Sequence, residues 1–191
     1  MATRLWHGFR VPDADVAAAA GAAAERVRGR PGRVQSGGTL VHAQFEHVLR
    51  GALPGPLSEF LRTTMEWYGC RGAFFHNDAH YDGVLFGVWC ILGPPRELVF
   101  PRIGRRVSAA MGSMAVFDPF EPHAVLGVGA DAYRSEDYEQ DDVSVFLGFE
   151  VELAPAVRGA FGIGAPHREG MTWSSRIAIN PATGAAATSG A

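Results

Sequence analysis

Short apolar segments follow one another from residue 68 to residue 153, and they constrain the fold of this chain more than any other feature. Clusters of Gly, Pro and Asp separate them, as turns separate strands. The last segment alternates apolar residues with others, so that one face of a strand would be apolar. We predict strands at Gly72–His76, Val84–Leu92, Glu97–Pro101, Met114–Asp118, His123–Val128 and Val143–Leu153. Several short strands preceded by helices predict a mainly β fold, a sandwich or barrel with flanking helices.

An Ala-rich segment near the N-terminus predicts the first helix. Residues 13–28 begin with Asp13 and Asp15, either of which can cap a helix, and end with two arginines that suit a helix C-terminus. The following Gly29-Arg30-Pro31-Gly32 would stop this helix.

The rest of the N-terminal part predicts a turn, a short apolar segment and another helix. Ser36-Gly37-Gly38 is typical of a turn, and Thr39–Phe45 is apolar. Leu57–Trp67 follows a Pro-Gly-Pro break and repeats its apolar residues at helical spacing, which predicts a second helix.

The chain length of 191 residues is enough for one domain with a real core. We expect this domain at residues 1–180, with a helical part at 1–67 and a β core at 68–155. Residues 181–191 are small and polar, and we expect them to be disordered.

Composition argues against several kinds of partner. The net charge is -3 and no basic stripe is present, so no nucleic-acid partner is indicated. No apolar run approaches the ~18 residues of a membrane span, and the N-terminus lacks the apolar core of a signal peptide. Two cysteines without a CxxC spacing are typical of a cytoplasmic protein with reduced thiols.

The strongest functional signal lies in Phe74-Phe75-His76-Asn77-Asp78. In an extended strand, residues i and i+2 point to the same side, so His76 and Asp78 would face one point. His123 stands at a later predicted strand. Two histidines and one carboxylate are the ligands of non-haem Fe(II) oxygenases, which keep other metal positions open. We therefore predict a metal site at these three residues.

A second His-x-Asp, His80-Tyr81-Asp82, is the internal alternative. The first is preferred because an apolar strand runs straight into His76, whereas Asp82-Gly83 is typical of a turn.

Five motifs occur in a fixed order between Tyr68 and Val128. They are Tyr68-Gly69-Cys70-Arg71-Gly72, His76-Asn77-Asp78, Glu97-Leu98-Val99-Phe100-Pro101, Met111-Gly112-Ser113-Met114-Ala115-Val116-Phe117-Asp118 and Glu121-Pro122-His123-Ala124-Val125. In this order they resemble the 2-oxoglutarate/Fe(II)-dependent dioxygenases, particularly the small prolyl-hydroxylase-like branch.

This resemblance implies a double-stranded β-helix, a jelly-roll of cupin type. It implies Fe(II), 2-oxoglutarate and O2, with ascorbate as a supporting reductant. His76, Asp78 and His123 would be the metal-binding and catalytic residues. The implied reaction hydroxylates a small molecule or an amino-acid or peptide side chain and converts 2-oxoglutarate to succinate and CO2. The alternatives are a cupin-type metal-binding barrel that acts without 2-oxoglutarate, and a non-catalytic binding barrel.

The chain departs from the family where the cosubstrate should be anchored. Family members usually place an Arg or Lys about one strand beyond the distal histidine, where it pairs with the far carboxylate of 2-oxoglutarate. Here the final predicted strand opens with Asp141-Asp142-Val143-Ser144, without a basic residue. The candidates for cosubstrate binding are Arg134 and Tyr68, with Arg102, Arg105 or Arg106 as alternatives to Arg134. The loop Ala130–Asp142 that carries Arg134 is either a solvated surface loop or a lid.

Overall fold

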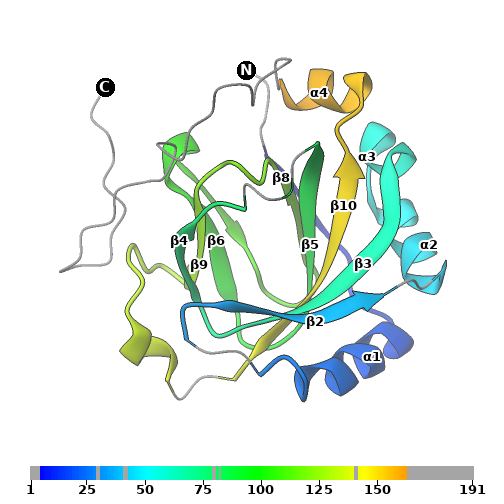
Figure 1. The fold of residues 1–191 in the computed structure, drawn as a ribbon. Coiled ribbons are helices and arrows are strands. Elements are labelled where there is room, and N and C mark those ends of the chain that lie inside the picture. The colour runs from blue at the N-terminus through cyan, green and yellow to red at the C-terminus, as the bar shows by residue number, and fades with distance from the viewer. Residues whose placement is uncertain are drawn as a thin grey trace.

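In the computed structural model, the chain folds into two antiparallel sheets with flanking helices (Figure 1). The structure describes residues 5–28, 31–40, 43–78, 81, 83–139 and 142–162. The larger sheet has the order β1 (Leu5–Phe9), β8 (Ser113–Phe117), β5 (Val84–Leu92), β10 (Ser144–Glu152), β3 (Leu61–Cys70) and β2 (Val34–Leu40). The smaller sheet has the order β4 (Ala73–His76), β9 (His123–Gly127), β6 (Arg96–Phe100) and β7 (Arg105–Ser108).

The helices lie beside the larger sheet, on the side away from the smaller one (Figure 1). They are α1 (Ala14–Ala24), α2 (Ala43–Ala52), α3 (Gly55–Glu59) and α4 (Pro155–Phe161), with short 3-10 turns η1 (Pro101–Ile103) and η2 (Ser135–Tyr138). Asp13 caps α1, because its carboxylate accepts a hydrogen bond of 2.9 Å from the Val16 amide, as predicted. None of the helices in the described ranges is long and apolar enough to cross a membrane.

Alternation of side chains gives the larger sheet two different faces. One face of β10 packs against the helices in an apolar cluster, to which it contributes Val145, Leu147, Phe149 and Val151. The opposite face contributes Phe146 to a second apolar cluster, which lies between the two sheets. The predicted alternation of this last strand is therefore confirmed. All six predicted strands are present, each with ends within one residue of the prediction.

The predicted helix at Leu57–Trp67 is wrong. Helix α3 ends at Glu59, and Leu61–Cys70 forms β3, which pairs with β10 on one side and β2 on the other. Pairing on both edges overrides the helical spacing of its apolar residues. Three strands thus fall in the N-terminal part, which was predicted to be mainly helical.

The predicted turn at Ser36-Gly37-Gly38 is also wrong, because these residues lie inside β2. The register against β3 shifts between Ser36 and Thr39, so the glycines form an irregularity in a strand. The expected tail at 181–191 lies outside the described residues.

A similar irregularity in β4 sets the direction of His76. Ala73 pairs with Val125 and His76 pairs with His123, so three steps along β4 match two steps along β9. One extra residue in β4 lets Ala73 and His76 both face the space between the sheets. Without it, residues three apart would point to opposite faces.

Candidate metal centre

His76, Asp78 and His123 converge, as the sequence predicted. The two histidines lie opposite each other on β4 and β9, with ring centroids 4.5 Å apart. Asp78 follows the end of β4 and places Oδ2 at 3.5 Å from His123 Nε2 and Oδ1 at 3.8 Å from His76 Nε2. One ligand atom from each residue lies within 4.8 Å of the others. We call these three residues the metal triad.

Hydrogen bonds to the backbone fix which imidazole nitrogens face Asp78. His76 Nδ1 lies 2.7 Å from the Phe74 carbonyl, and His123 Nδ1 lies 2.9 Å from the Glu121 carbonyl. A carbonyl oxygen can only accept, so both Nδ1 atoms carry the hydrogen. In a neutral ring each Nε2 then presents a lone pair, as metal-binding histidines do. The donor set therefore fits a divalent metal ion.

The triad is covered on one side and open on the other. The rings of Phe117 and Phe100 pack against His123, with centroids 4.7 and 5.8 Å from that of the imidazole, and His123 is only 3% exposed. The side chains of His76 and Asp78 are 25% and 19% exposed. Reactants could thus approach from the His76 side.

The open side faces a cavity of about 280 Å³ between the two sheets. Its wall includes the metal triad and an apolar part made of Val34, Phe86, Val88, Leu98, Phe117, Val125 and Phe146, with Cys70 beside them. A second polar group in the wall is formed by Ser36, Glu66, Tyr68 and Tyr81, which we call the carboxylate cluster.

The carboxylate cluster is joined by hydrogen bonds. The hydroxyls of Ser36 and Tyr68 both donate to the Glu66 carboxylate, and the Tyr68 and Tyr81 hydroxyl oxygens lie 2.7 Å apart. Burial, then the hydrogen bond to Glu66, raises the pKa of the Tyr68 phenol above its usual range. Burial also raises the pKa of Tyr81. Both phenols therefore keep their protons near neutral pH.

Sequence reasoning found Tyr68 but missed Ser36 and Glu66. Glu66 and Tyr68 stand two residues apart, and on a strand they share one face. That signal was present in the sequence, but the predicted helix Leu57–Trp67 contained Glu66 and ended before Tyr68, so the two residues were not assigned to one strand.

The predicted cosubstrate anchor does not lie in the cavity wall. Arg134 is exposed, precedes η2 and is not among the residues that line the cavity. Arg105 is exposed on β7, and Arg102 lies at the surface with Nε 3.7 Å from Glu121 Oε1. The chain contains no lysine, and no arginine is among the described residues of the cavity wall.

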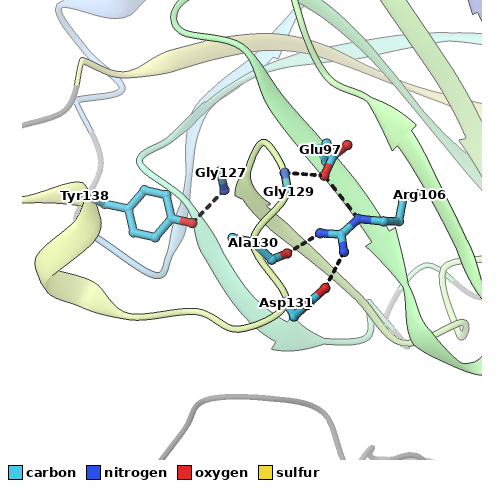
Figure 2. Close-up of polar contacts among 7 residues, drawn as sticks. All are labelled: Glu97, Arg106, Gly127, Gly129, Ala130, Asp131 and Tyr138. Carbon is cyan, nitrogen blue, oxygen red and sulfur yellow. Dashed lines mark hydrogen bonds and ion pairs between the residues drawn. The ribbon is translucent and has the colours of Figure 1, made fainter.

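Arg106, the remaining candidate, is engaged elsewhere (Figure 2). Its Nε lies 3.1 Å from Glu97 Oε2 and its Nη1 lies 2.6 Å from Asp131 Oδ1, while Nη2 donates to the Ala130 carbonyl. Glu97 also accepts from the Gly129 amide at 3.0 Å. These contacts tie the segment after β9 to the β6–β7 hairpin.

The described part of the 130–142 loop packs on the outer face of the smaller sheet. Tyr133 packs against the apolar cluster on that face and stacks on Tyr138 with ring centroids 5.1 Å apart. The Tyr138 hydroxyl accepts from the Gly127 amide at 2.8 Å (Figure 2). None of the loop's described residues lines the cavity, which favours a surface loop over a lid.

The alternative pair, His80 and Asp82, lies outside the described residues. Tyr81 between them is in the cavity wall. In comparisons with known proteins, no family model matches this chain, and no curated protein matches it significantly.

Proposed function

We propose that this chain is a non-haem Fe(II)- and 2-oxoglutarate-dependent dioxygenase. It would hydroxylate a small molecule or an amino-acid side chain and release succinate and CO2. The observation that carries the proposal is the metal triad, whose two imidazoles present Nε2 beside a carboxylate at the wall of a cavity. Three ligands on one side of an octahedral metal leave positions for a chelating oxo acid and O2.

His76, Asp78 and His123 would hold the metal, and iron in such a site supplies the oxidation of both the oxo acid and the substrate. The rest of the chain would position the reactants. The backbone carbonyls of Phe74 and Glu121 hold the imidazole rings in the orientation that ligation needs. The apolar part of the wall would exclude water and hold a C–H bond near the metal.

The proposal extends to the fold and the location. Two facing antiparallel sheets with the triad between them are compatible with a double-stranded β-helix, which we propose for residues 61–152. The two cysteines are free and buried, as expected in the cytoplasm, where we propose that the protein acts.

A second candidate is a cupin-type metal enzyme that acts without 2-oxoglutarate. It is favoured by one observation, that no arginine occurs among the described residues of the cavity wall to pair with the far carboxylate. A different small co-ligand would then take the open metal positions.

Anaerobic titration with Fe(II) and 2-oxoglutarate distinguishes the two candidates. The dioxygenase is expected to show a weak visible charge-transfer band that needs both additions, and to form succinate when O2 is admitted. In His76→Ala both signals should be lost, whereas His47→Ala, an exposed histidine on α2, should keep them. Tight Fe(II) binding with no band and no succinate would favour the second candidate.

A further inference from the structure

We infer that the carboxylate cluster binds a protonated amine or guanidinium group of the substrate. The inference rests on the proposed function in taking the cavity as the substrate site. The cluster and the metal triad line the same cavity, so a substrate held at one can be presented to the other.

The direction of the hydrogen bonds shows what the cluster can offer to a ligand. An ionised carboxylate carries no hydrogen, so the Ser36 and Tyr68 hydroxyls must both donate to Glu66. Tyr68 has thereby used its only hydrogen. The hydrogen in the 2.7 Å contact between Tyr68 and Tyr81 must then come from Tyr81. The Ser36 and Tyr68 hydrogens therefore point to Glu66, and the Tyr81 hydrogen points to the Tyr68 oxygen. Glu66 itself offers a ligand only oxygen lone pairs.

The negative charge of the carboxylate cluster also favours a ligand that donates hydrogen bonds. A carboxylate has about four acceptor positions, of which the two hydroxyls use two. No arginine or histidine of the described ranges forms an ion pair with Glu66. A ligand that donates N–H groups and carries positive charge would satisfy both the remaining lone pairs and the charge.

Aromatic rings beside Glu66 favour the same kind of ligand. Tyr81 stacks on Phe86 with ring centroids 4.8 Å apart, and Tyr68 meets Phe86 edge-on at 5.8 Å. All three rings line the cavity. Aromatic faces attract organic cations, and partial burial strengthens this attraction. The apolar part of the wall would contact the carbon chain of the substrate.

An anion is disfavoured at the cluster. The far carboxylate of 2-oxoglutarate would meet the negative charge of Glu66 and no hydroxyl hydrogen that is free to donate. Tyr68, expected from the resemblance to bind the cosubstrate, is therefore assigned to the substrate instead.

Small probes on the metal-free protein test this without any need for turnover. The probes are n-butylammonium and n-butylguanidinium, with butan-1-ol as the neutral match and butanoate as the anion, and binding is measured by ligand-detected NMR. Both cations should bind the wild type more tightly than butan-1-ol, and butanoate should bind most weakly. Glu66→Gln should weaken both cations by about tenfold or more and leave butan-1-ol unchanged.

Two control variants locate the cation and account for net charge. Glu25→Gln removes the same charge at an exposed position after α1 and should bind the probes like wild type. Asp78→Asn tests the other carboxylate of the cavity and should weaken the cations much less than Glu66→Gln.

Equal binding in Glu66→Gln and wild type, or a loss in Asp78→Asn alone, would overturn the inference. The wild type provides a second test should Glu66→Gln fail to fold, since tighter binding of butanoate than of butylammonium would also overturn it. Cation binding that depends on Glu66, in a protein that makes no succinate, would uphold this site while contradicting the proposed function.

Discussion

The metal triad and the carboxylate cluster share one cavity and use hydrogen bonds in opposite ways. In the triad, each imidazole directs its hydrogen away from the centre, toward a backbone carbonyl. In the cluster, the hydroxyl hydrogens are directed inward, toward Glu66. Both arrangements leave lone pairs facing the cavity. The difference lies in the donor atoms, because two imidazoles suit a transition metal whereas oxygens framed by aromatic rings suit an organic cation.

The largest effect is expected from removing one ligand of the triad. His123→Ala should weaken Fe(II) or Co(II) binding by more than about a hundredfold. Even the loss of a residue that only hydrogen-bonds to a metal ligand lowers metal affinity by about 10–100-fold. Anaerobic metal titration measures this, and the n-butylammonium affinity of the metal-free protein should change little. Metal affinity that survives in His123→Ala would show that the triad is not the metal site.

A smaller effect, confined to the carboxylate cluster, is expected from Gly148→Ala. A Cβ at Gly148 would lie 2.2 Å from Tyr68 Cε2 and 3.3 Å from Phe86 Cζ, so the Tyr68 ring must shift. We expect the free energy of unfolding to fall by about 1–3 kcal/mol, as for other overpacked sites. Butylammonium binding should weaken while metal affinity is kept. Chemical denaturation and the two titrations measure these changes.

Gly21→Ala is the matched control, because a Cβ at Gly21 in α1 meets nothing within 4 Å. It should stabilise the protein by about 0.5–1 kcal/mol through helix propensity. A loss of metal affinity in Gly148→Ala equal to the loss of cation affinity would mean that the two groups are coupled.

The smallest effect concerns alkaline pH. Burial raises the pKa of Tyr133 to about 12, and it also raises the pKa of Tyr68, Tyr81 and Tyr138. Absorbance of tyrosinate at pH 10.5, where unfolded tyrosine with its pKa of about 10 is mostly ionised, should therefore be low until denaturant is added. The unfolded chain releases these protons first, so the stabilisation is complete below pH ~10 and is lost as the pH rises further.

Glu66→Gln should let Tyr68 ionise at lower pH than in wild type, because the hydrogen bond to the carboxylate is lost. Full ionisation of all the tyrosines near pH 10 in the folded protein would contradict the burial that raises the pKa of each tyrosine.

The metal triad could be predicted because most of its signal is local. His76 and Asp78 stand two residues apart after an apolar run, and His123 opens a strand of clear apolar character. The strands Val84–Leu92 and Ser144–Glu152 could also be predicted from the sequence, since buried strands have long apolar or alternating sequences.

The carboxylate cluster could not be predicted in the same way. From Leu61 to Met65 the apolar residues fit a helical repeat as well as a strand, and only the pairing with β10 and β2 decides between them. Those partners are distant in the sequence. Arg134 was predicted to reach the cavity because it follows His123 closely in the sequence. Tyr133, however, packs on the outer face of the smaller sheet and holds the described part of the 130–142 loop there, away from the cavity.

The extra residue in β4 makes the metal triad depend on chain length as well as on residue identity. His76 faces inward only because three steps along β4 match two steps along β9. Deleting one residue between Ala73 and His76 would keep every ligand in the sequence and turn the imidazole toward the other face of the sheet. In evolution, one short deletion could thus separate His76 from Asp78 and His123, and one insertion could bring the three side chains together again. Relatives of this chain should therefore be compared by the length of this segment as well as by the presence of their histidines.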